Sequence, residues 1–135
     1  ILAAEDNDIN AEILKKMLKL KGASVTITPN GRQALDAFMD SETGSYDIIF
    51  MDIMMPVMNG YEATKAIRAL ADDDSLPEAK RQEARDIPII AMTANAFNDD
   101  VQKSLLAGMD AHTTKPINLD NVCHTVADVL SRKKG

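Results

Sequence analysis

The residues with the clearest chemical potential stand at the ends of short apolar segments. Asp52 directly follows the apolar run Ile48–Met51. Because burying an unpaired charge is costly, we expect this carboxylate at the tip of a strand, facing solvent or a cation. Three other apolar segments end in a similar way, on Glu5-Asp6, on Thr93 and on Lys115-Pro116. If these strands lie side by side, acidic, hydroxyl and amine groups meet in one site.

Three of these groups are carboxylates, those of Glu5, Asp6 and Asp52. Converging carboxylates repel one another unless a counter-charge is present. A hard divalent cation supplies that charge, and ligands that are all oxygen suit Mg²⁺, with Mn²⁺ as the alternative. An aspartate placed beside such a cation can act as a nucleophile toward phosphorus and form an aspartyl-phosphate.

Phosphoryl transfer needs mainly positioning and neutralisation of the equatorial oxygens. The cation could neutralise one oxygen and Lys115 a second. The Thr93 hydroxyl, with nearby backbone N–H groups, could bind the third. A carboxylate nucleophile needs no base to activate it, so the lack of an evident catalytic histidine is compatible with this chemistry.

The elements that must position these residues follow from the hydrophobic pattern. Apolar runs alternate with amphipathic segments, which indicates βα units and a parallel sheet. We predict strands at about 1–4, 24–28, 47–51, 87–92 and 111–114, and helices at about 9–20, 30–38, 61–70, 98–107 and 119–130. Right-handed crossovers then place helices on both faces of an open sheet, whose ligands bind at the carboxyl ends of the strands.

The stretch from Ala71 to Asp86 interrupts this rhythm and is longer than a usual connection. It carries first acidic and then basic residues. We interpret it as a solvated helix extension and loop, and the alternative is a surface for a specific partner.

Composition limits the classes of protein. The 135 residues, 45% hydrophobic and 27% charged, are typical of one soluble globular domain. A net charge of −6 argues against a nucleic-acid surface, and no segment is long and apolar enough to cross a membrane. The single cysteine, Cys123, excludes an intrachain disulfide. Because the chain begins at Ile1, inside a predicted strand, we expect residues 1–135 to be one domain of a longer protein.

The motifs closely resemble those of the receiver domain of two-component response regulators. The acidic pair Glu5-Asp6, the phosphoacceptor Asp52, the switch hydroxyl Thr93 followed by Ala94, and Lys115-Pro116 occur in the family's order and spacing. Three segments look most like receivers of hybrid sensor histidine kinases: EDNDIN from Glu5, MPVMNG from Met55 and MTANA from Met92.

The resemblance implies a role for each site residue. Asp6, Asp52 and the backbone carbonyl of Met54 would ligate the metal directly, and Glu5 would act through water. Thr93 would be the switch hydroxyl, and Lys115 would precede a cis proline, Pro116. The phosphoryl group would come from a phosphohistidine on a histidine kinase or a histidine phosphotransfer domain.

Two positions depart from the family pattern. Met54, two residues after Asp52, stands where a polar side chain could help to orient an attacking water, which a methionine cannot do. His112, three residues before Lys115, stands where receivers usually carry a tyrosine or phenylalanine that moves inward with the threonine. An imidazole could take this switch role, but it is smaller and polar. The alternative is a partly exposed strand residue that is only weakly coupled to Thr93.

The resemblance further implies a flavodoxin-like α/β fold, a doubly wound five-stranded parallel sheet of order 2-1-3-4-5. The domain would catalyse only its own phosphorylation and dephosphorylation, and any kinase activity would lie elsewhere in a parent protein. That parent could be a membrane-anchored sensor kinase, with this domain in the cytoplasm. Two alternatives remain: a degenerate receiver used for docking, and an aspartate-nucleophile phosphatase, which usually has a second acid where Met54 stands. The sequence does not indicate an oligomeric state.

Overall fold

Five parallel strands form one sheet in the order β2-β1-β3-β4-β5. The computed structural model describes residues 1–53, 55, 57–93, 107–114 and 119–134, except for the side chains of 93, 114, 119 and 132–134. The strands are β1 (Leu2–Ala4), β2 (Thr26–Thr28), β3 (Ile49–Asp52), β4 (Ile89–Thr93) and β5 (Ala111–Thr114). The predicted strand order and parallel pairing are therefore confirmed.

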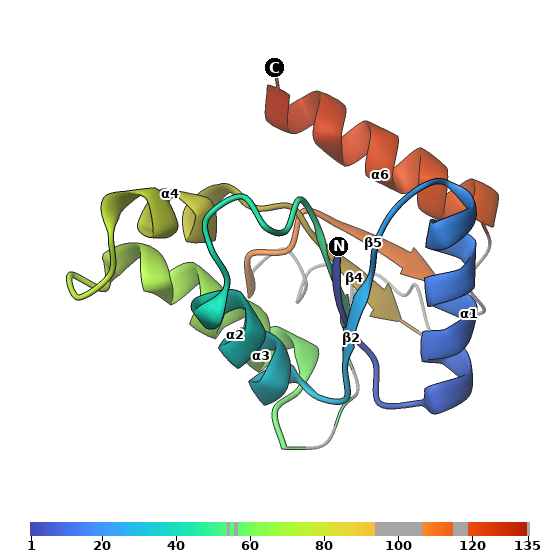
Figure 1. The fold of residues 1–135 in the computed structure, drawn as a ribbon, viewed down its shortest axis with the longest axis horizontal. Helices are drawn as coiled ribbons and strands as arrows, with labels where there is room; N and C mark the ends of the chain where they lie inside the picture. Colours follow the sequence, from blue (N-terminus) through green and yellow to red (C-terminus); the bar gives the residue numbers. More distant parts are fainter. Residues whose placement is uncertain (54, 56, 94–106, 115–118, 135) are drawn as a thin grey trace.

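The helices cover both faces of the sheet, as Figure 1 shows. They are α1 (Asp8–Leu20), α2 (Gly31–Asp40), α3 (Gly60–Ala69), α4 (Glu78–Asp86) and α6 (Leu119–Lys134), with a 3₁₀ turn at Leu70–Asp72. Helices α1 and α6 lie on one face, and α2, α3 and α4 lie on the other (Figure 1). The helix predicted at about 98–107 falls almost entirely outside the described residues.

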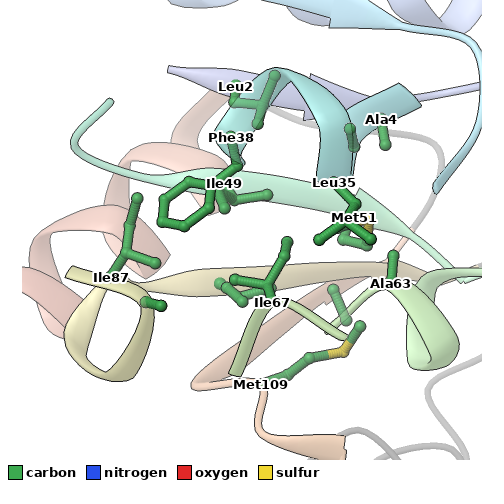
Figure 2. Packing of buried hydrophobic residues seen from close by; sticks show 14 of the residues in the cluster. Leu2, Ala4, Leu35, Phe38, Ile49, Met51, Ala63, Ile67, Ile87 and Met109 are labelled. Atoms are coloured by element: carbon green, nitrogen blue, oxygen red, sulfur yellow. The ribbon is translucent and has the colours of Figure 1, made fainter. Parts of the chain in front are cut away.

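The sheet is buried on both faces, which is the usual state of a parallel sheet. Because successive side chains of a strand point to opposite faces, Ile49 and Met51 of β3 pack toward α2 and α3, while Phe50 packs toward α1 and α6. Figure 2 shows the first of these clusters, with side chains of β1 and β3 meeting those of α2 and α3. Two separate apolar cores thus hold the strands from either side.

The sequence of α1 carries apolar residues at helical spacing on two neighbouring stripes, one with Ile9, Ile13, Met17 and Leu20 and one with Leu14 and Leu18. The residues that α1 buries are Ala11, Leu14 and Leu18. Ile9 is 71% exposed, Ile13 42% and Leu20 78%. The apolar period predicts the helix correctly but does not identify which face is packed, and it leaves an exposed apolar strip on α1.

The connection at 71–86 contains a packed helix and is more than a solvated extension. Lys80 of α4 is only 4% exposed. Its Nζ donates to the Ser41 carbonyl (3.1 Å) and hydroxyl (2.8 Å), pairs with Glu83 Oε1 (2.9 Å), and lies 4.0 Å from the centre of the Phe38 ring. Burial of this charge is compensated by these four contacts. Helix α4 is thereby fixed to the end of α2.

Arg68 of α3 joins α4 to the turn before β5. Its guanidinium donates to the carbonyls of Gly108 (Nε, 3.0 Å) and Ala84 (Nη1, 3.0 Å) and pairs with Asp110 Oδ2 (3.0 Å). The same Asp110 oxygen accepts from the Ile89 N–H at 2.9 Å. Burial lowers the pKa of the Arg68 guanidinium, and the charge of Asp110 opposes this shift.

Among the described helices, none is both long and apolar enough to cross a membrane.

Replacing Arg68 with alanine should lower the free energy of unfolding by about 2 kcal/mol, because carbonyl groups and a partly buried carboxylate lose their donor. Urea denaturation would measure this. The matched control is Arg32→Ala, since the Arg32–Asp36 pair is 3.5 Å long with both side chains at least half exposed. Its removal should cost less than about 0.5 kcal/mol. Equal losses in the two variants would contradict this account of Arg68.

Candidate functional site

Three carboxylates converge at the carboxyl edge of the sheet. Strands β1 and β3 are neighbours, with Ala4 opposite Met51, so the residues that follow, Glu5 and Asp52, also lie side by side. One oxygen from each of Glu5, Asp6 and Asp52 lies within 4.8 Å of the others. Glu5 and Asp52 are each 3% exposed, whereas Asp6 is exposed. The structure thus brings together the three acids that the sequence predicts for a metal site.

The donor set fits a hard divalent cation. Like charges at this separation repel, most strongly where burial lowers the local dielectric constant. All three groups offer only oxygen atoms, and the exposed Asp6 leaves one side of the cluster open to water, as Mg²⁺ prefers.

Glu5 is oriented by the first turn after β1. Its Oε1 accepts from the Asn7 N–H at 3.3 Å. The Asn7 side chain in turn caps α1, accepting from the Asn10 N–H at 3.0 Å. Because Asn7 fills the capping position, Glu5 and Asp6 are available to the cluster.

The loop after Asp52 is closed by a hydrogen bond between its two ends, next to the end of β3. The Ile53 N–H donates to the Met92 carbonyl (3.1 Å), and the Gly60 N–H donates to the Ile53 carbonyl (3.0 Å). A Cβ at Gly60 would collide with the backbone of Asp52, so α3 can begin here only at a glycine. Asn59 and Glu62 then form a capping box that starts α3.

Within this loop, Val57 has a positive φ of 67° and is 82% exposed. A β-branched residue in the left-handed region costs about 1–2 kcal/mol. The loop therefore holds an apolar side chain in solvent, near the site, in a strained backbone conformation.

Other predicted site residues are placed only in part. Thr93 ends β4 at the same edge as Asp52, which pairs with Met92 one residue earlier. The Thr93 side chain lies outside the described part of the structure, as do Met54, Lys115 and Pro116. Their predicted roles, and the cis peptide before Pro116, therefore stay predictions.

His112 lies on β5, opposite Ala91, and is half-buried. It lines a cavity of about 200 Å³ together with Thr113, Asn121, His124 and Thr125. Both histidines of the chain therefore border this cavity. The predicted switch role of His112 is not tested by this placement.

Sequence reasoning missed the contribution of the turn between β2 and α2. The Glu5 N–H donates to the Thr28 carbonyl, and the Gly31 N–H donates to the Met58 carbonyl, both at 3.0 Å. The only sequence signal at this turn is Asn30, a residue type that favours the capping position of a helix. Asn30 does cap α2, accepting from the Gln33 N–H at 2.9 Å.

Comparison with known proteins assigns the family. The family model for the response regulator receiver domain matches residues 1–127. The chain therefore belongs to the receiver domains of two-component signalling, as the site motifs predict.

Curated relatives include hybrid signal transduction histidine kinase I of Dictyostelium discoideum, 44% identical over 120 residues, and probable histidine kinase 2 of Oryza sativa, 40% identical over 144. The matches cover 87% and 98% of this chain, but only 6% and 13% of those proteins. The chain thus corresponds to a small part of each relative.

Solved structures agree in fold. The receiver domain of the sensor histidine kinase PA1611 of Pseudomonas aeruginosa, with a magnesium ion in its active-site cleft, is 32% identical with a TM-score of 0.77, covering 99% of this chain and 96% of that one. A chain of the Saccharomyces cerevisiae complex between the histidine phosphotransfer protein Ypd1 and the receiver domain of Ssk1 is 34% identical with a TM-score of 0.77, covering 90% of this chain and 81% of that one.

Replacing Asp6 with asparagine should weaken Mg²⁺ binding about tenfold, because one of three converging negative charges is lost. Without Mg²⁺ the same variant should melt at a higher temperature than the parent, since repulsion within the cluster is relieved. Calorimetric titration and thermal denaturation would measure the two effects. The control is Glu12→Gln, an exposed acid of α1 outside the cluster. An unchanged Mg²⁺ affinity in Asp6→Asn would contradict the assignment of Asp6 to the metal site.

Proposed function

We propose that this domain is a Mg²⁺-dependent phosphoacceptor of a phosphorelay, and that Asp52 receives the phosphoryl group from a phosphohistidine. One observation carries the proposal: Asp52, 3% exposed, ends the central strand β3 within 4.8 Å of two further carboxylates. A phosphorylation site of this kind needs a nucleophilic oxygen and a divalent cation at the same place.

The transfer balances with one proton from solvent and no other reactant. The carboxylate of Asp52 forms the new P–O bond while the P–N bond of the phosphohistidine breaks, and the freed imidazole takes a proton from solvent. Glu5, Asp6 and Asp52 would hold the cation, with the Met54 carbonyl as a further proposed ligand. Bound there, Mg²⁺ (or Mn²⁺) would neutralise charge on the phosphoryl oxygens.

We propose that residues at the neighbouring strand ends respond to phosphorylation of Asp52 and act as a conformational switch. Lys115 would neutralise a second phosphoryl oxygen, and the Thr93 hydroxyl would bind a third. Closure of Thr93 would move His112 on the neighbouring strand, β5, which pairs with β4. A local charge would thereby bias a bistable element that presents a partner surface.

The phosphodonor is proposed to dock on the N-terminal part of the exposed apolar strip of α1, at Ile9 and Ile13. Ile9 and Ile13 stand in the first two turns of α1, which begins two residues after the acidic pair, and are 71% and 42% exposed. Exposed Val57 adds an apolar side chain from the loop after Asp52. Apolar groups that border a reactive site favour a protein donor, because they bury against it. A histidine phosphotransfer domain or a histidine kinase fits this role.

We place the domain within a longer signalling protein, since it matches only a small part of each curated relative. Any kinase activity would belong to other parts of that protein. Because phosphohistidine derives from ATP, we expect the domain to act in the cytoplasm.

The function is tested by mixing the domain with a ³²P-labelled histidine phosphotransfer protein and Mg²⁺. Label should move to the domain, be lost in hydroxylamine, as an acyl phosphate is, and be absent from Asp52→Asn. Transfer to Asp52→Asn at the parent rate would exclude Asp52 as the acceptor.

The docking strip gives a separate prediction. The double substitution Ile9→Ala with Ile13→Ala should slow transfer from the phosphotransfer protein about tenfold, since burial of two large side chains is lost. Phosphorylation by acetyl phosphate should be unchanged, because a small donor needs no docking surface. The control is Leu20→Ala, a 78% exposed residue of the same helix at its C-terminal end, which should leave both rates unchanged. Equal slowing with both donors would place Ile9 and Ile13 in the site chemistry instead.

A further inference from the structure

The turn between β2 and α2 (Thr28–Gly31) connects the acidic pair Glu5-Asp6 to the loop that follows Asp52. On one side, the Thr28 carbonyl accepts from the Glu5 N–H at 3.0 Å, and the Thr28 hydroxyl donates to the Ala3 carbonyl at 3.2 Å. On the other side, the Gly31 N–H donates to the Met58 carbonyl at 3.0 Å. Residues 5 and 6 of the cluster and the loop that follows Asp52 are thus joined by one short segment.

Gly31 is the position where this connection is tightest. A Cβ there would lie 2.5 Å from the Met58 carbonyl oxygen, 2.9 Å from the Ala63 Cβ and 3.1 Å from the Asn59 carbonyl oxygen. Two of these three atoms are backbone, which cannot move aside as the end of a flexible side chain can. Only glycine allows the N-terminus of α2 to approach the loop this closely.

This contact restrains the loop after Asp52 from outside. The two ends of the loop are joined by the Gly60 N–H···Ile53 carbonyl bond. Between those ends Val57 is held at a φ of 67°, a conformation that persists only where the surroundings enforce it. The bond from Gly31 to Met58, the residue directly after Val57, is a backbone restraint that comes from outside the loop.

We propose that Gly31 is a positioning residue of the metal and phosphoacceptor site, and that the turn Thr28–Gly31 sets the distance between the acidic pair and the loop after Asp52. Gly31 acts through Met58 and does not touch the cation. Partners that hydrogen-bond metal ligands directly contribute about ten- to a hundredfold to affinity, and a restraint that acts through Met58 should lie at the lower end of that range.

The inference rests on the proposed function, because it requires that the three carboxylates bind Mg²⁺. The test is a calorimetric Mg²⁺ titration of the parent domain, Gly31→Ala and Gly22→Ala. Gly22 is the matched control: its φ is +82°, so alanine is strained there, but a Cβ would have open space within 4 Å. Gly22 follows the C-terminal end of α1, away from the acidic cluster at its N-terminal end.

Gly31→Ala should raise the Kd for Mg²⁺ about tenfold, and Gly22→Ala should leave it unchanged, although both lower the melting temperature. A second readout separates positioning from general damage. Phosphorylation of Gly31→Ala by acetyl phosphate should be slow at low Mg²⁺ and should recover toward the parent rate when Mg²⁺ is saturating.

If Gly31→Ala does not fold, Thr28→Val replaces it. This variant keeps the side-chain shape of a residue that is 7% exposed and removes only its bond to Ala3. Its Kd for Mg²⁺ should rise about threefold, as the turn loses one hydrogen bond.

The outcomes are distinct. If the parent binds Mg²⁺ and the variant at the turn binds it equally well, the positioning role is overturned and the proposed function stands. If the parent itself does not bind Mg²⁺, both fail. An equal loss of affinity in Gly22→Ala would show a general effect of destabilisation and would also overturn the inference.

Discussion

Mutual repulsion among three carboxylates is the constraint on which the rest of this structure depends. Glu5, Asp6 and Asp52 are held within 4.8 Å of one another, and two of them are almost fully buried. Such an arrangement costs free energy in the absence of a cation. It persists because the strands that carry the acids are fixed independently of them, by packing on both faces of the sheet. The free energy of packing thus offsets the repulsion among the carboxylates and keeps the site ready for a cation and a phosphoryl group.

The strand order is what converts separate sequence motifs into that site. With β1 and β3 adjacent, the acidic pair and Asp52 meet at one edge, and β4 brings Thr93 to the same edge. Backbone hydrogen bonds then hold the connecting loops: Asp52's loop closes on itself and is tied to α2 through Gly31. Far from this edge, Arg68 and Lys80 fix the additional helix α4 to the rest of the domain. Among the described residues, backbone hydrogen bonds hold the segments next to the site, and side-chain contacts of Arg68 and Lys80 hold the additional helix.

Much of the fold and of the acidic site can be predicted from the sequence. The period of the apolar residues predicts the parallel sheet, and the polar residues that end its strands predict which acids converge. Local signals also succeed where the interaction is local: Asn7, Asn30 and Asn59 cap the helices that follow them, through bonds to residues three positions on. These features depend on neighbours in the chain or on a regular fold rule.

The parts that sequence did not predict depend on contacts between distant segments. The spacing Ile9, Ile13 and Leu20 has a helical period like that of Leu14 and Leu18, and only the packing decides which set is buried. Lys80 is charged, and nothing near it in sequence indicates that Ser41 and Phe38 will enclose it. Gly31 looks like an ordinary residue after a helix cap until Met58, twenty-seven positions later, is placed against it. A single sequence contains no signal for such pairs.

The most direct test of the central claim is the intact mass of the domain after incubation with acetyl phosphate, with and without Mg²⁺, beside Asp52→Asn. The account predicts one added phosphoryl group in the parent domain, dependent on Mg²⁺, and none in the variant. No added mass in the parent, with Mg²⁺ binding confirmed separately, would contradict the claim that the three carboxylates form a phosphorylation site, as would an adduct that survives replacement of Asp52.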